Sequence, residues 1–271
     1  MTSEFVHLHN HSDYSLLDGA QKIDQLVNTI DDLNMDAVAL TEHGNMFSVL
    51  PYYKQAKKAG IKPIIGCEIY VAVGSRFEKK TRSDGGWGNN HLILLAQNFT
   101  GYKNLMKLVT AGYLEGFYYR PRIDMDLLRE YSEGLICMSA CLKGVVPEKM
   151  LKGDYEGARK EALLFSEIFQ DRYYLEIQNH GIPEEEQNLK NMKKLSQDLN
   201  LPLVCTNDAH YAKKEHWEAH DIHICLGTGK ERSDPNRLRY ATPEFYFKTQ
   251  DEMHKLFKEF PGAIENTRKI A

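Results

Sequence analysis

The sequence predicts an α/β protein in which repeated strand and helix units form a barrel. Short apolar runs alternate with segments whose apolar residues recur at helical spacing, and about seven such units follow one another along the 271 residues. Histidines and carboxylates stand at or just after the ends of several predicted strands. Because the strands of a βα barrel end at one rim, these side chains are expected to meet there.

The first half of the chain alternates strands and helices. Ile23, Leu26, Val27 and Ile30 recur at helical spacing, and Gly60 is typical of the end of a second helix. The remaining apolar runs are too short for helices and are interpreted as strands. The predicted strands are 5–8, 37–40, 63–73 and 92–96, and the predicted helices are 23–30, 46–59 and 101–115.

The second half continues the pattern. Strands are predicted at 135–138, 173–177 and 201–205, with helices near 155–170 and 184–199. Thr249 and Glu252 fit a capping box at the start of a further helix. A last helical pattern, 263–270, stops without a cap, so residues from about 250 to 271 are expected to lead from a single domain into a region absent from this chain.

Three histidines near the N-terminus predict a metal site. His7, His9 and His11 are two residues apart, so on an extended segment they share one face and can point to one place. Any one histidine is more often a surface or hydrogen-bonded core residue. The cluster, followed by further histidines and acids at later strand ends, favours ligands of a divalent cation such as zinc, manganese, iron or magnesium.

His91 does not fit a purely parallel arrangement, because it opens its predicted strand instead of ending it. Either that strand runs in the opposite direction or the preceding loop folds over the rim. The loop, 74–90, is polar and glycine-rich and is long enough to act as a lid.

Composition excludes several classes of protein. With 42% hydrophobic residues the chain can bury a full core, and no stretch approaches a membrane span. The N-terminus does not read as a signal peptide, and the five cysteines lack the spacing of a disulfide framework or zinc knuckle, which predicts a cytoplasmic protein. A net charge of −4 argues against binding duplex nucleic acid mainly by electrostatics.

Three segments resemble the polymerase and histidinol phosphatase (PHP) domain family. They are 7–19 (HLHNHSDYSLLDG), 40–45 (LTEHGN) and 206–211 (TNDAHY). Segments 112–124 (GYLEGFYYRPRID) and 176–181 (EIQNHG) more narrowly resemble the N-terminal region of bacterial DNA polymerase III alpha subunits. The resemblance covers essentially the whole chain.

The resemblance implies a distorted seven-stranded βα barrel with up to three metal ions at the C-terminal rim of the strands. Position by position it implies nine ligands, none of which is lost: His9, His11, Asp18, His43, Glu68, His91, Cys141, Asp208 and His210. His7 and Glu42 occupy positions from which they are expected to orient ligand imidazoles.

Phosphoester hydrolysis is the reaction that such a cluster favours. Glu68 is expected to bridge two cations, Asp208 to hold one, and His43 to ligate or to protonate the leaving group. The resemblance implies a metal-dependent 3′–5′ exonuclease acting on a DNA primer 3′ end. It also implies contact with the remaining polymerase domains and, through the full subunit, with an exonuclease subunit or a sliding clamp. Polymerase activity is not expected of this fragment.

Other features allow two interpretations. Segment 117–122 (FYYRPR) either stacks on and neutralises a single strand or forms a packed corner of the barrel. Arg76, Lys79, Lys80 and Arg82 either meet phosphates or form a solvated charged loop. His216, His220 and His223 are expected on a helix surface or in its packing, and His180 receives no role.

Three hypotheses follow for function. The chain is an active metal-dependent phosphoesterase of a replicative polymerase, a metal-stabilised scaffold that supports the polymerase core or an exonuclease subunit, or a small-molecule phosphatase such as a histidinol phosphatase. The polymerase-like segments around Glu115 and Glu176 count against the third.

Overall fold

The computed structural model describes residues 3–81 and 88–271. Residues 82–87, which include the tip of the loop predicted as a lid and Arg82 of the predicted charged loop, lie outside the described residues.

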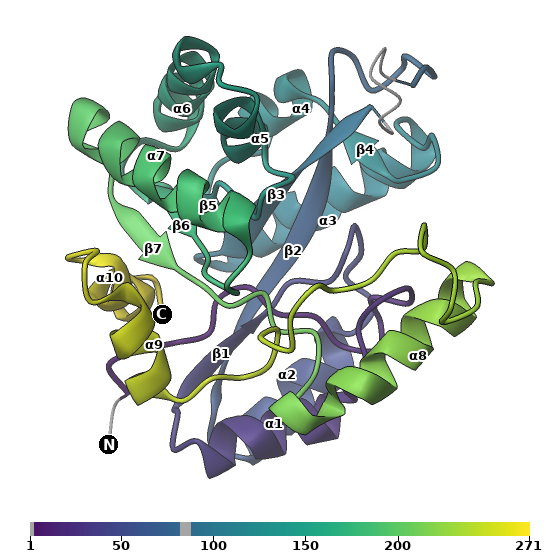
Figure 1. The fold of residues 1–271 in the computed structure, drawn as a ribbon. Coiled ribbons are helices and arrows are strands. Elements are labelled where there is room, and N and C mark those ends of the chain that lie inside the picture. The colour runs from purple at the N-terminus through teal and green to yellow at the C-terminus, as the bar shows by residue number, and fades with distance from the viewer. Residues whose placement is uncertain (1–2, 82–87) are drawn as a thin grey trace.

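A curled seven-stranded sheet forms a half-barrel at the centre of the fold (Figure 1). Its main path runs in the order β1-β2-β3-β5-β6-β7, and β4 pairs with β2. The strands are β1 (Ala37–Leu40), β2 (Lys62–Ala72), β3 (Asn89–Ala96), β4 (Arg122–Ile123), β5 (Leu135–Met138), β6 (Tyr173–Ile177) and β7 (Leu203–Cys205). The predicted fold class is therefore confirmed, with one strand reversed.

Helices cover the outer face of the sheet (Figure 1). The helix α2 packs on β2, α3 on β3, α6 on β5, α7 on β6 and α10 on β7. The helices are α1 (Ile23–Asp32), α2 (Val49–Lys58), α3 (Phe99–Leu114), α4 (Met125–Glu130), α5 (Val145–Leu151), α6 (Tyr155–Phe169), α7 (Pro183–Leu199), α8 (Trp217–Thr228), α9 (Gln250–Phe257) and α10 (Ala263–Ile270), with 3₁₀ turns η1 (Gln170–Arg172) and η2 (Lys214–His216).

Apolar periodicity explains these elements. In α1 the residues Ile23, Leu26, Val27 and Ile30 are buried and form the stripe that faces the core. Every residue of β1, β5 and β6 is buried, as expected for strands that are covered on both faces. The core therefore lies on both sides of the sheet, and the polar groups of the site gather at the ends of the strands.

The reversed strand is β3, which pairs antiparallel with both β2 and β5. Its first residues therefore lie at the same edge of the sheet as the last residues of its neighbours. His91 is paired with Tyr70, near the end of β2, and bridges to Gly144. Of the two arrangements that the sequence left open for His91, the structure shows the reversed strand.

The N-terminal segment is extended but forms only isolated bridges, so the strand predicted at 5–8 is not present as a regular strand. His7 bridges to Val38 in β1, and Asn10 bridges to Ala209 beyond β7. Backbone hydrogen bonds of 2.8 Å from Ala39 N to His7 O and 2.9 Å from His11 N to Ala209 O join the two edges of the half-barrel through this segment. It carries His9 and His11 into the middle of the fold.

The two C-terminal helices pack back onto the fold. The predicted capping box is confirmed at α9, where the Thr249 hydroxyl accepts from Glu252 N at 3.2 Å and Glu252 Oε2 accepts from Thr249 N at 2.7 Å. In α10 the Asn266 side chain donates to Leu203 O in β7 at 2.7 Å, and Thr267 Oγ1 accepts from Val6 N at 3.0 Å. Residues 250–271 thus cover the strand β7 and the start of the chain.

Replacing Thr249 by alanine is expected to lower the free energy of unfolding by about 1 kcal/mol, because the first turn of α9 loses its side-chain acceptor. Urea unfolding followed by circular dichroism measures this change. An unfolding midpoint equal to that of the wild type would show that the capping box contributes nothing to stability.

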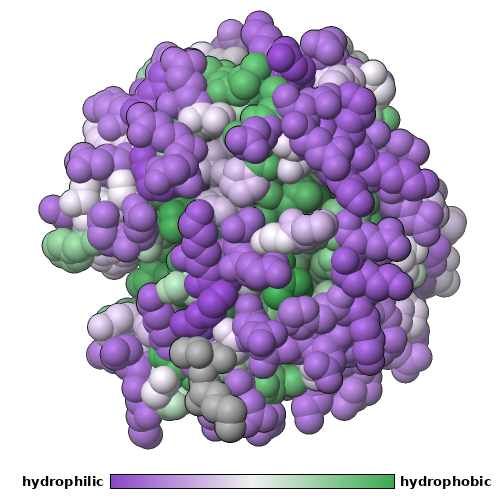
Figure 2. All heavy atoms as spheres, turned by 90° about the vertical axis from the view of Figure 1, so that its left-hand side faces the viewer, coloured by the Kyte–Doolittle hydropathy of each residue, from purple (hydrophilic) through white to green (hydrophobic). Residues whose placement is uncertain are grey.

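One face of the molecule is mainly hydrophilic. Figure 2 shows this face, formed by the left-hand side of Figure 1, where hydrophilic side chains predominate and hydrophobic residues show in patches between them. Within residues 3–81 and 88–271, no helix combines the length and the apolar character needed to cross a bilayer.

Candidate metal centre

All nine residues expected as ligands lie within one cluster of mutual contacts, towards the rim of the half-barrel at which the parallel strands end. Three groups in the described chain have side-chain donor atoms within 4.8 Å of one another, close enough to share a cation. Two residues belong to two groups each: His11 and Glu68. The groups are His9, His11, Glu68 and Asp208; Glu68, His91 and Cys141; and His11, His43 and His210.

The first group is enclosed, with all four residues buried. His9 Nε2 lies 3.0 Å from Glu68 Oε2 and 3.2 Å from Asp208 Oδ1. His11 Nε2 lies 3.1 Å and 3.2 Å from the same two oxygens. Asp208 adopts a left-handed backbone conformation with φ of +43°, which a non-glycine residue seldom adopts. Two imidazoles and two carboxylates therefore face a common point.

The second group lies on the other side of Glu68. The second carboxylate oxygen of Glu68, Oε1, contacts His91 Nδ1, and His91 Nδ1 lies 3.8 Å from the Cys141 sulfur. Cys141 follows β5, and His91 opens the antiparallel β3, so the reversed strand is what brings these two side chains together. The carboxylate of Glu68 consequently has one oxygen in each of two groups.

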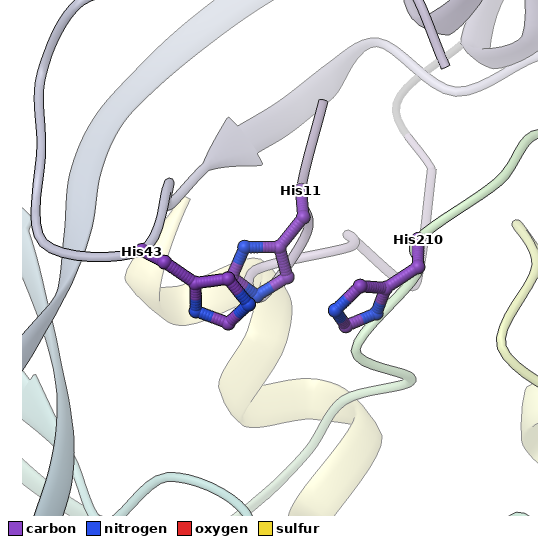
Figure 3. Close-up of side chains that lie close together, drawn as sticks. All are labelled: His11, His43 and His210. Atoms are coloured by element: carbon purple, nitrogen blue, oxygen red, sulfur yellow. The ribbon is translucent and has the colours of Figure 1, made fainter. Parts of the chain in front are cut away.

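The third group is made of stacked imidazoles (Figure 3). The ring centroid of His11 lies 3.9 Å from that of His43 and 4.5 Å from that of His210. Asp18 completes this side, with Oδ1 at 3.1 Å from His43 Nε2 and Oδ2 at 4.0 Å from His210 Nε2. Asp18 is thus placed as a carboxylate neighbour of the imidazole group.

Hydrogen bonds set the orientation of three ligand rings. His9 Nδ1 donates to Glu176 Oε1 at 2.7 Å, and His210 Nδ1 donates to Asp208 O at 2.7 Å. His11 Nδ1 donates to Ser15 Oγ at 3.0 Å, which in turn donates to Glu42 Oε2 at 2.6 Å. Each ring therefore bonds outward through Nδ1 and points Nε2 to the centre, where the unprotonated nitrogen could bind a cation, as metal-binding imidazoles do.

Glu42 is therefore placed to orient the ring of His11 through Ser15, whereas His7 is not placed to orient any of the expected ligand rings. His7 Nε2 donates to Lys248 O at 2.9 Å, and its ring packs edge-on against Phe5 and Phe247. The expectation that all three N-terminal histidines point to one place was wrong for His7, because the segment has only isolated bridges and its ring fits between two aromatic side chains.

The charges of the centre are strongly coupled. Burial raises the pKa of Glu68, but the imidazoles of His91 and His43 outweigh it and hold that pKa well below its ordinary value. Burial lowers the pKa of His9, but Asp208 and Glu176 outweigh it and raise that pKa well above its ordinary value. Burial lowers the pKa of His210 to about 3. Protons and metal cations therefore compete for the same nitrogen atoms.

Several of these buried atoms lack hydrogen-bond partners among the described residues. They include His11 Nε2, both ring nitrogens of His43, Asp18 Oδ1, Glu68 Oε1 and Asp208 Oδ1. Unpaired buried polar atoms are costly, and cations bound within this cluster would give them partners. Imidazole, carboxylate and one thiol are a ligand set for zinc, manganese or iron, and magnesium prefers the carboxylates. The residues therefore fit a polynuclear site for divalent cations.

Three residues that hydrogen-bond the expected ligands were given no role by the sequence reasoning: Glu176, Ser15 and Tyr240. Glu176 accepts from His9, from Thr206 Oγ1 at 2.6 Å and from Ala140 N at 3.0 Å. A carboxylate inside the otherwise apolar and aromatic run of β6 is a signal that could have pointed to it. Ser15 and Tyr240 carried no such signal, because their contacts are made only in the tertiary structure.

Two histidines of uncertain role are structural. His180 is buried between Glu185 Oε1 at 2.6 Å and Asn207 O at 2.9 Å, and it stacks on Phe245. His220 packs α8 onto the fold by donating to Asp18 O at 2.7 Å. Of the two interpretations of the histidines in this region, packing is the correct one for His220.

Arg76, Lys79 and Arg122, three of the basic residues considered for contact with nucleic acid, bond to other groups of the protein. Arg76 pairs with Asp124 at 3.0 Å and with Glu115 at 2.6 Å, and Lys79 donates to two carbonyls. In segment 117–122, Arg122 is buried in a corner of the fold, whereas Arg120 is exposed. The packed corner is therefore correct for Arg122.

Known proteins resemble this chain closely. The family model described as PHP domain matches residues 7–180. The chain is 52% identical over 269 residues to DNA polymerase III subunit alpha of Borreliella burgdorferi and 48% identical over 268 residues to that of Treponema pallidum. These alignments cover 99% and 98% of this chain but only 23% of each relative, so the chain spans about a quarter of their length.

A solved structure from Bacteroides vulgatus, described as a two-domain protein containing a predicted PHP-like metal-dependent phosphoesterase, aligns with a TM-score of 0.43 and 18% identity, over 76% of this chain and 52% of that one. That likeness is too weak to bear on the site. The family match spans more than half of the chain and includes His9, His11, Glu68 and Cys141, four of the residues expected as ligands. The chain therefore belongs to the PHP domain family.

Proposed function

We propose that this chain binds up to three divalent cations and hydrolyses phosphoesters, acting as a 3′–5′ exonuclease on the primer end within a replicative DNA polymerase alpha subunit. The strongest support is the position of Glu68, whose two oxygens belong to two different groups of ligand atoms. A carboxylate so placed is suited to bridge two cations. Bound cations would supply an activated water and would neutralise the phosphate.

The side chains have separable roles in this proposal. Asp208 Oδ1 lies between His9 and His11 and anchors the enclosed group, whereas His210 belongs to the imidazole group. His43 is the most open of the five expected ligand imidazoles, with 17% of its side chain exposed. It can therefore exchange a proton with solvent, and we assign it to protonating the leaving oxygen if it is not itself a ligand.

Degradation of a mismatched primer tests the proposal. The wild-type chain and its His9→Ala variant are each incubated with the primer and with manganese, zinc or chelator. Elemental analysis measures the metal content of both proteins. Cleavage is expected to depend on metal and to fall at least 100-fold in His9→Ala. His254→Ala is the matched control, because His254 lies on α9 beside Glu4 and away from the centre; it is expected to retain full cleavage.

A second candidate function is a metal-stabilised scaffold. The ligands come from both edges of the half-barrel, so a bound cation would tie the N-terminal segment to the loop after β7. In that case the domain would support the remaining polymerase domains or dock an exonuclease subunit. The scaffold would be favoured over the nuclease if the wild type binds metal but does not cleave the primer. In that case His9→Ala would lose the metal, and its melting temperature would fall by several degrees.

The wider setting is also proposed by similarity to the alpha subunits. We infer that the chain works in the cytoplasm beside the polymerase domains absent here, and that the sliding clamp is reached only through the full subunit. Preference for histidinol phosphate over a primer end would contradict this assignment.

A further inference from the structure

A tyrosine hydroxyl lies inside the centre but outside the ligand set. Tyr240 belongs to the segment between α8 and α9, which is without regular helix or strand in residues 230–245. Its hydroxyl lies 2.8 Å from His210 Nε2 and 3.3 Å from Asp18 Oδ2. Both atoms belong to residues that would hold cations in the proposed function.

The protein holds this hydroxyl in place from both sides. Before Tyr240 along the chain, Arg237 makes a two-pronged contact with Asp221 of α8, at 2.6 Å and 2.8 Å. After it, the Thr242 hydroxyl donates to His180 O at 2.8 Å. The Tyr240 ring packs edge-on against Phe245, with centroids 4.5 Å apart. The hydroxyl is therefore a fixed group of the site.

The role of the hydroxyl follows from its two acceptors. His210 has its proton on Nδ1, so its Nε2 lone pair accepts from Tyr240, and Asp18 offers a carboxylate oxygen. A cation held by His210 and Asp18 would engage these lone pairs, and the phenolic proton would then need another acceptor. A phenol keeps its proton at neutral pH, and it donates strongly to anionic oxygens.

We propose that Tyr240 donates a hydrogen bond to a non-bridging oxygen of the substrate phosphate, beside the group formed by His11, His43 and His210. This inference rests on the proposed function, because it takes the phosphoester as substrate. It adds to the centre a neutral donor that recognises phosphate without holding metal.

Replacing Tyr240 by phenylalanine tests the proposal, since the ring packing is kept and only the hydroxyl is lost. The ligand is thymidine 5′-monophosphate, titrated calorimetrically into the manganese-loaded chain. The dissociation constant is expected to rise about tenfold, as for the loss of one hydrogen bond to a charged group. Metal content, from elemental analysis, and melting temperature are expected to stay at their wild-type values.

Tyr246→Phe is the matched control. Tyr246 lies in the same segment, but its hydroxyl donates to Glu252 at 2.6 Å, away from the centre, so its loss is expected to leave nucleotide binding unchanged. An unchanged dissociation constant in Tyr240→Phe would overturn the proposal. Loss of a metal ion from Tyr240→Phe would also overturn it, by making Tyr240 a ligand.

The wild type separates this proposal from the proposed function. If it binds metal but not thymidine 5′-monophosphate, the role of Tyr240 in phosphate recognition is overturned while the metal centre stands. If the wild type binds no divalent cation at all, the proposed function fails, and the proposal for Tyr240 fails with it.

Discussion

Glu68→Gln is expected to abolish most metal binding and to reduce phosphoester hydrolysis by at least about 100-fold. Glutamine keeps the shape of the side chain but removes the charge and one of the two anionic oxygens. Those oxygens contact four imidazoles, His9, His11, His43 and His91, and they join two of the three ligand groups. Loss of an outer hydrogen-bond partner of a metal site typically costs 10- to 100-fold, and loss of a bridging ligand should cost more.

Elemental analysis after dialysis against manganese or zinc measures this effect, and melting with and without chelator gives an independent one. A cation that binds only the folded chain raises the melting temperature, so chelator should lower it in the wild type and leave it unchanged in Glu68→Gln. Glu115→Gln is the control, because Glu115 is an exposed carboxylate paired with Arg76. Full metal content in Glu68→Gln would show that the assigned centre is wrong.

Arg122→Ala is expected to lower the free energy of unfolding by about 3 kcal/mol. The Arg122 side chain is 2% exposed, and it donates to Gly116 O at 3.0 Å and to Glu78 O at 2.8 Å. Its truncation leaves buried carbonyls without donors and removes packing beneath the Tyr118 ring. Arg120→Ala, two residues away and exposed, is the control and is expected to change stability by less than about 0.5 kcal/mol.

Urea unfolding in the presence of chelator compares the two arginine variants without a contribution from bound metal. Equal midpoints for Arg122→Ala and Arg120→Ala would mean that the buried hydrogen bonds of Arg122 are not what holds this corner together. A lower midpoint for Arg122→Ala alone would confirm that Arg122 stabilises the packed corner, although it lies in a segment whose aromatic and basic residues also suit a nucleic-acid contact.

Helices and the general fold class could be predicted because their signals are local. The apolar stripe of α1 and the capping box of α9 are properties of a few neighbouring residues, and the structure has both. The direction of β3 could not be predicted, because an apolar run such as 92–96 reads the same whether the strand runs parallel or antiparallel to its neighbours.

The residues of the site could likewise be predicted only where the signal is local in the sequence. Family motifs named the nine ligand positions, and the structure places all nine in one cluster. The assignment of metal to them remains a prediction. Glu176 and Tyr240 were not predicted as parts of the site, because their contacts with His9 and His210 join residues 167 and 30 positions apart. His7 was misjudged because alternation along a segment fixes the side chain's face only where a regular sheet holds the segment.

The N-terminal segment that lies between β1 and the loop after β7 also has a consequence for biogenesis. As the chain leaves the ribosome, His9 and His11 emerge first, but Asp208 and His210 follow only after about 200 further residues have been synthesised. The enclosed ligand group cannot form before then, so a nascent chain carries its first histidines without their partners for most of translation. On the proposed function, metal acquisition would therefore be a late step in the maturation of this domain, and truncated chains that end before β7 would lack Asp208 of the enclosed group and its neighbour His210.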